Sequence, residues 1–116
     1  MIMAIQKYMC ILRKQPGTKQ EQPSPAQMQE MYAVFNTWKE KFKENILDMG
    51  AQLKSGGKIL TETGLKDGPF VEAKEIVGGF MILSAESYEQ AAEVARGCPG
   101  VMSPGTSIEI REMAGP

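Results

Sequence analysis

Four charged side chains between positions 67 and 75 are the residues of this chain best placed to do chemistry. They are Asp67, Glu72, Lys74 and Glu75, in the stretch KDGPFVEAKEIVGGF of residues 66–80. A carboxylate beside an ammonium group can bind a carboxylated or hydroxylated ligand, or transfer a proton when partly buried, because each charge tunes the pKa of the other. The candidate catalytic residues are therefore Asp67, Glu72 and Lys74. The predicted ligand-binding residues are Asp67, Phe70, Glu72, Lys74, Glu75 and Phe80.

Structural roles compete with these assignments. An aspartate before a glycine commonly accepts hydrogen bonds from its own turn, so Asp67 has a structural interpretation too. Charged residues that precede a strand are usually solvated. Cys98 is a possible nucleophile, but it follows a predicted helix, and the negative potential of a helix C-terminus disfavours a thiolate. Cys10 is predicted to be a core residue of a strand.

Composition excludes several classes of function. The chain has 116 residues, no histidine and a formal net charge of −1. The missing histidine removes the usual general base and the commonest metal ligand, so we predict no metal site, and no motif predicts a cofactor. The charge balance disfavours a nucleic-acid partner. No apolar run reaches the roughly 20 residues of a membrane span. Two cysteines without CxxC spacing are typical of a reduced, cytoplasmic protein.

The first half of the chain predicts one strand and one long helix. QKYMCILRK, residues 6–14, is apolar on both faces and is predicted to be an interior strand. Ser24 and Pro25 predict a helix N-cap and first helical residue. Spacings of three and four then extend a single apolar stripe to Gly50, with a core-packing role. The stripe consists of Met28, Met31, Tyr32, Phe35, Trp38, Phe42, Ile46 and Met49.

The second half predicts three more strands and a second helix. KILTET, residues 58–63, is predicted to be a short strand, followed by a tight turn at Asp67–Gly68 with Pro69. EIVGGFMILS, residues 75–84, is predicted to be a central strand, in which Gly78 and Gly79 require a bulge or a close backbone approach. Ser84 and Ser87 are both candidate N-caps of a second helix that ends at residues 97–99, and Ser87 with Gln90 fits a capping box. SIEIREM begins a strand with Ile108 and Ile110 inward, which ends near Arg111.

The order β, α, β, β, α, β predicts a single α+β domain over residues 1–116. Its fold is a ferredoxin-like βαββαβ plait, with a four-stranded antiparallel sheet and both helices on one face. The first strand is apolar on both faces, so the open face of the sheet needs a cover. A second copy of the chain provides one, and we predict a sheet-to-sheet homodimer.

The motifs in this order resemble the DGPF-domain group of the YCII-related family. The residues that carry the resemblance are YMCIL, DGPFVEAKEIVGGFMIL, ARGCPG and SIEIREM, which span nearly the whole chain. The resemblance implies a dimeric α/β barrel of two ferredoxin-like subunits packed sheet on sheet. Relatives in the wider family resemble small-molecule enzymes that use a His–Asp pair. This chain has no histidine, and Cys98 precedes Pro99 where the aspartate would stand, so that mechanism does not transfer to it.

Three functions remain open from the sequence. The first is a dimeric module that binds a small molecule in a pocket between sheet and helices. The second is a small-molecule enzyme of an isomerase-like or lyase-like type that uses Asp67, Glu72 or Lys74 instead of histidine. The third is a regulatory module that binds another protein through an exposed helix face.

Overall fold

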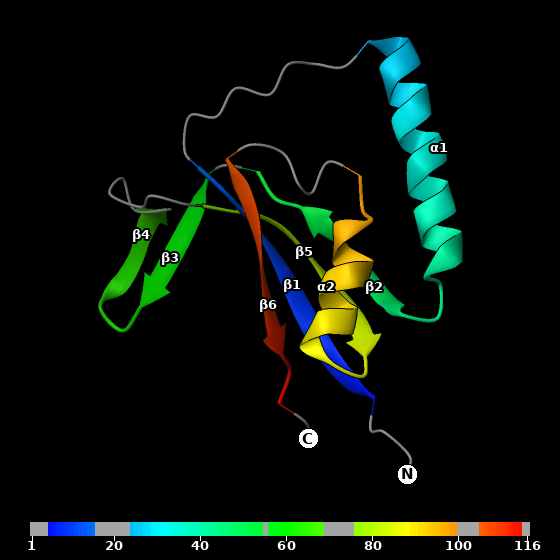
Figure 1. Cartoon of the computed structure of the whole chain (residues 1–116). Helices are drawn as coiled ribbons and strands as arrows, with labels where there is room; N and C mark the ends of the chain where they lie inside the picture. The colour runs from blue at the N-terminus through cyan, green and yellow to red at the C-terminus, as the bar shows by residue number, and fades with distance from the viewer. Residues whose placement is uncertain (1–4, 16–23, 55, 69–75, 100–104, 115–116) are drawn as a thin grey trace.

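A computed structural model describes residues 5–15, 24–54, 56–68, 76–99 and 105–114, to which all structural statements below refer. These residues form two helices and six strands (Figure 1). The elements are β1 (Gln6–Lys14), α1 (Pro25–Lys41), β2 (Ile46–Gln52), β3 (Gly57–Thr61), β4 (Gly64–Gly68), β5 (Ile76–Ala85), α2 (Tyr88–Arg96) and β6 (Thr106–Glu112).

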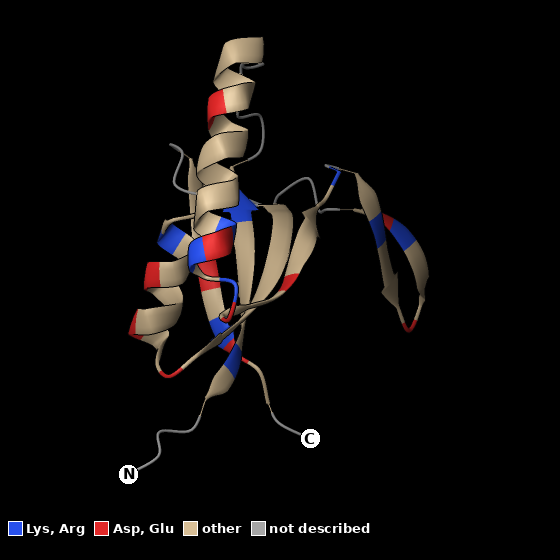
Figure 2. Cartoon of the chain, turned by 90° about the vertical axis from the view of Figure 1, so that its right-hand side faces the viewer, with Lys and Arg blue, Asp and Glu red and all other residues tan. Residues whose placement is uncertain are grey.

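Four of the strands form one antiparallel sheet in the order β2-β5-β1-β6. Both helices lie on the same face of this sheet, as Figures 1 and 2 show. With β3 and β4 set aside, the chain order and the sheet order are those of a ferredoxin-like plait. The predicted fold class is therefore confirmed, including both helices on one face.

The core lies between the sheet and the two helices. Cys10 of β1, Met81 and Leu83 of β5, and Trp38 of α1 are buried together with Val94 and Ala95 of α2. β1 and β5 occupy the two central positions of the sheet, which confirms both interior-strand predictions. Tyr8 and Cys10 pair with Leu83 and Met81, so alternate side chains of the two central strands enter this core.

Paired glycines place a bulge in β5, as predicted. Leu12 pairs with Gly79 and Arg13 pairs with Val77, which leaves Gly78 as the extra residue. A Cβ at Gly78 would lie 2.6 Å from the Lys14 side chain, and one at Gly79 would lie 3.0 Å from the carbonyl oxygen of Ala51. Close approach thus accounts for both glycines.

The predicted caps of both helices are present. Ser24 accepts a hydrogen bond from the Gln27 N–H, and the Gln27 side chain accepts one from the Ser24 N–H, which completes a capping box. Ser87 accepts from the Gln90 N–H, but the Gln90 side chain accepts from Glu86 instead of Ser87. The second helix therefore has the predicted N-cap without the reciprocal bond.

The prediction of one helix from Pro25 to Gly50 is wrong. α1 ends at Lys41, and residues 46–52 form the edge strand β2. Two register shifts interrupt the pairing of β2 with β5, and Gly50 adopts a φ of +65° within it. These irregularities break the alternation that identifies a strand, while Ile46 and Met49 happen to continue the helical spacing of the apolar stripe.

The apolar stripe of α1 is also only partly in the core. Trp38 is buried and Phe35 and Phe42 pack against the core cluster, whereas Met28 and Tyr32 remain exposed. Figure 1 shows the reason, because the N-terminal half of α1 extends past the sheet and α2. The core-packing prediction is therefore wrong for that half of the helix.

Residues 57–68 form a separate hairpin, which corrects two further predictions. The strand predicted at 58–63 pairs with β4 in a two-stranded sheet and is not the second strand of the main sheet. Its turn lies at residues 62–63, where Thr61 and Thr63 share a hydroxyl hydrogen bond and Gly64 has a φ of +133°. Asp67 and Gly68 lie in β4 and not in a tight turn, because Asp67 pairs with Lys58 and Gly68 pairs with Gly57 in the ladder, while Pro69 lies outside the described residues.

The C-terminal strand follows its predicted pattern. Ile108 and Ile110 pack against the core, while Glu109 forms an ion pair with Arg13 at 3.4 Å. β6 extends one residue beyond the predicted end, because Glu112 still pairs with Tyr8 and its N–H donates to the Tyr88 hydroxyl. Neither helix of the described residues is long and apolar enough to cross a membrane.

Candidate functional site

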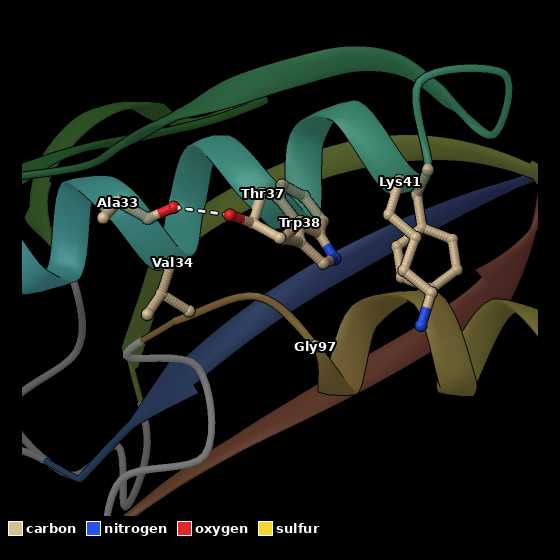
Figure 3. A pocket seen from close by; sticks show the side chains of 7 residues that line it. Ala33, Val34, Thr37, Trp38, Lys41 and Gly97 are labelled. Atoms are coloured by element: carbon tan, nitrogen blue, oxygen red, sulfur yellow. Dashed lines mark hydrogen bonds between the residues drawn. The ribbon is translucent and has the colours of Figure 1, made fainter.

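An open depression lies between the C-terminal half of α1 and the end of α2 (Figure 3). Its volume is about 370 Å³. This value is near the lower end of the range for small-molecule sites, roughly 300–1,000 Å³. The lining side chains are mostly apolar and come largely from α1. They are Ala33, Val34, Thr37, Trp38, Lys41, Phe42 and Gly97.

Trp38 forms the inner wall of this depression, and its position is fixed by α2. The indole Nε1 donates a hydrogen bond to the Val94 carbonyl oxygen at 2.7 Å. Gly97 permits the close approach, because a Cβ there would lie 2.8 Å from Cδ1 of the indole. The Phe35 ring packs 5.7 Å away, centroid to centroid. The wall is therefore held by one buried hydrogen bond and by packing.

The polar groups of the depression are few. The Thr37 hydroxyl donates to the Ala33 carbonyl oxygen at 2.9 Å within α1, as Figure 3 shows. The Lys41 ammonium lies 5.2 Å from the centroid of the Phe42 ring, in cation–π range. No carboxylate of the described residues forms an ion pair with it. An apolar surface with one cation at its rim suits an apolar ligand that carries a negative charge.

The described residues that the sequence predicted to form the site do not line this depression. Asp67 lies in the β3–β4 hairpin, where its exposed carboxylate forms an ion pair with Lys58. Phe80 lies in β5 of the main sheet and is partly buried. The two residues thus belong to separate sheets. Phe70, Glu72, Lys74 and Glu75 lie outside the described residues, and their roles stay predictions.

Both cysteines are unpaired thiols in an apolar environment. Burial raises the pKa of the Cys10 thiol to about 11 and also raises the pKa of the Cys98 thiol. A thiol that keeps its proton is a poor nucleophile. The burial of Cys10 confirms its predicted place in the core, and the raised pKa of Cys98 agrees with an inert role.

Little in the sequence indicated that Lys41 would lie at a binding site. Its neighbours in the run Lys39, Lys41, Lys43 are interspersed with acidic residues, which predicts a solvated helix face. Lys43 is solvated as expected, although it lies just beyond the end of α1, and it pairs with Glu40 at 3.2 Å. The adjacency of Lys41 to Phe42 was the available hint. Trp38 was expected to pack in the core, and it does so while also lining the depression.

The described residues offer no cluster of three or more acidic or cysteine side chains that could hold a metal ion. The molecule is a ferredoxin-like α+β protein with an inserted hairpin and an apolar depression over its core. The family model of the YCII-related domain matches residues 6–114, so the chain belongs to the YCII-related family. A search of the curated proteins found no match.

Proposed function

We propose that this YCII-related protein binds a small apolar molecule with an anionic group, in the depression between α1 and α2. The observation that carries this proposal is the Lys41 ammonium at the rim of a surface made by Trp38 and Phe42. The rings would pack against the apolar part of the ligand, and the ammonium would pair with a carboxylate or a similar anion. Aromatic and medium-chain carboxylates are the ligand classes that fit.

The chain's single tryptophan makes the proposal directly measurable, because Trp38 lines the depression. Titration of the protein with aromatic and aliphatic carboxylates is expected to change the tryptophan fluorescence in a saturable way. Lys41→Met is expected to weaken binding about two- to fivefold, since the ligand anion loses an exposed counter-charge. Lys39→Met is the matched control, because it removes the same charge from the same helix turn outside the depression.

Two results would overturn the binding proposal. One is the absence of a saturable response to every carboxylate of the panel. The other is equal weakening by Lys41→Met and Lys39→Met, which would reduce the effect to the general charge of the helix.

Carboxylate-based catalysis has less support. Asp67 is exposed and paired with Lys58, so it lacks the burial that tunes a catalytic carboxylate. If an activity is found, Asp67→Asn and Glu72→Gln test that role, because loss of turnover with an intact fold would favour the enzyme. A regulatory module would tolerate both substitutions and would co-purify with another protein.

We also propose that the protein is a homodimer of the DGPF type, joined through the open face of the sheet. Met9, Ile11, Phe80 and Ile82 alternate with the core residues of β1 and β5, so they lie on the face away from the helices. A partly exposed apolar centre of this kind suits a second copy. The reduced Cys10 and Cys98 agree with a cytoplasmic location.

The dimer has its own test. Light scattering at micromolar concentration should give twice the chain mass, and Ile82→Lys should give the monomer mass. Tyr32→Lys, on the helix layer, should leave the dimer intact. A monomer mass for the unaltered protein would end the dimer proposal without affecting the ligand proposal.

A further inference from the structure

The β3–β4 hairpin has less support from the rest of the chain than any other described strand pair. A two-stranded hairpin on its own is at best marginally stable in water. Within the described residues, β3 and β4 pack substantially only against each other. Leu60 and Leu65 are cross-strand partners, and they are 77% and 63% exposed. The hairpin therefore presents an apolar pair that its own chain does not cover.

The two faces of the hairpin differ. Alternation places Leu60, Leu65, Lys58 and Asp67 on one face, which we call the leucine face. Lys58 and Asp67 form an ion pair there, so the leucine face carries no net charge. On the opposite face, Ile59 packs over Gly68, where a Cβ would lie 2.7 Å from the isoleucine side chain. That isoleucine is already half-covered, whereas the leucines are not.

The hairpin lies on the side of the main sheet where a second copy of the chain could cover its leucine face. In Figure 2 the helices lie on one side of the main sheet and the hairpin stands out on the other, which is the side of the open sheet face. The radius of gyration of the chain is 16.2 Å. A compact domain of this length has a radius of gyration of about 13 Å. The excess comes from a shape of 48 × 44 × 19 Å, in which the hairpin and the N-terminal half of α1 project from the body.

We propose that the hairpin is an arm that packs its leucine face onto a second copy of the chain. This inference rests on the proposed dimer through the open sheet face. A copy docked on that face would lie on the same side of the sheet as the hairpin. Two-fold symmetry would give each subunit one arm on the other, and the leucines of both arms would leave the solvent. The uncharged leucine face suits a buried contact of this kind.

The test compares variants that change the net charge equally. Leu60→Glu with Leu65→Glu changes the charge by −2 on the leucine face. Lys66→Glu also changes it by −2, but Lys66 pairs with Ile59 on the opposite face. Sedimentation velocity over a concentration series gives the dimer dissociation constant of the full chain. We expect the double variant to weaken the dimer at least about tenfold and Lys66→Glu to leave it within about twofold.

Amide hydrogen exchange supplies a second measurement on the same proteins. Residues 57–68 of the unaltered protein are expected to be protected at high concentration and to lose protection on dilution to the monomer. Protection of β1 and β5 reports whether the double variant is folded. An unaltered protein that stays monomeric would overturn both the dimer and the arm. A dimer that the double variant leaves unchanged, with residues 57–68 unprotected, would overturn the arm alone. Protection of residues 57–68 only in the presence of a different protein would also overturn the arm.

Discussion

Trp38 packs in the core, donates a hydrogen bond to α2 and lines the depression. Its replacement therefore tests which of these contacts holds α1 in place. Trp38→Phe keeps a ring at this position but removes the indole N–H that donates to the Val94 carbonyl oxygen. Trp38→Ala removes the ring as well, and with it the inner wall of the depression. Comparison of the two variants separates the hydrogen bond from the packing.

The contacts and the burial of Trp38 determine how large a loss of stability we expect from each variant. After Trp38→Phe the Val94 carbonyl oxygen still accepts from the Gly97 N–H at 3.3 Å, so it is not left unpaired. The expected loss in free energy of unfolding is therefore that of one net hydrogen bond and a little packing, about 1–2 kcal/mol. Trp38 is only 4% exposed, so Trp38→Ala empties a buried site. The expected loss for that variant is about 3–5 kcal/mol.

Urea unfolding followed by far-UV circular dichroism measures both values without relying on the lost fluorophore. Tyr32→Phe is the control, because Tyr32 is an exposed aromatic residue of the same helix, and no loss is expected. The reasoning is refuted if Trp38→Ala costs less than about 1 kcal/mol, or if Trp38→Phe costs as much as Trp38→Ala. The second result would mean that the hydrogen bond, and not the packing, holds α1 on the core.

Three further predictions concern stability. Gly50 has a φ of +65°, and a Cβ there would lie 1.7 Å from the Phe80 carbonyl oxygen. Gly50→Ala is therefore expected to lower the free energy of unfolding in urea by about 2 kcal/mol or more. Gly56→Ala should leave it unchanged, because nothing lies within 4 Å of a Cβ there, and equal stability of the two variants would refute the steric argument. Folded Cys10 keeps its proton to a pKa of about 11 and the unfolded thiol to about 9. Between pH 9 and 11 unfolding therefore releases a proton, which lowers the free energy of unfolding by up to about 3 kcal/mol. From pH 8 to 11, under reducing conditions, the unaltered protein should lose this much more stability than Cys10→Ala. Equal slopes for the two proteins would contradict this. Ser24→Ala should lower the free energy of unfolding by about 1 kcal/mol through loss of an N-cap side chain. An unchanged urea midpoint would show that the capping box at Ser24 contributes nothing.

The parts of the fold that follow regular patterns were predictable from the sequence. β1, β5 and β6 alternate or run continuously apolar, and both helix starts carry serine caps, so each was placed within a residue or two. β2 was not predicted from the sequence, because its two register shifts hide the alternation and its apolar residues fit a helical period by coincidence. The plait was still predicted correctly, since the hairpin strand at residue 58 took the place of β2 in the expected order.

The candidate site was less predictable than the fold. The depression depends on how the end of α2 meets α1, and Trp38 and Val94 are 56 residues apart in the chain. No local pattern reports such a contact. Charge patterning pointed to residues 67–75, where Asp67 is exposed in the hairpin and Glu72 lies outside the described residues. Only the apolar stripe predicted for α1 led directly to the depression, through Trp38 and Phe42.

The hairpin occupies the link between two strands that are neighbours in the sheet. Gln52 at the end of β2 pairs with Gly79 of β5, and the Leu53 N–H donates to the Gly78 carbonyl oxygen. The chain therefore leaves the main sheet and returns to it at nearly the same point. An insertion of this kind is modular, because its length and surface can change in evolution without altering the order of the four main strands. The domain can thus acquire or lose an arm while its core and its depression stay the same.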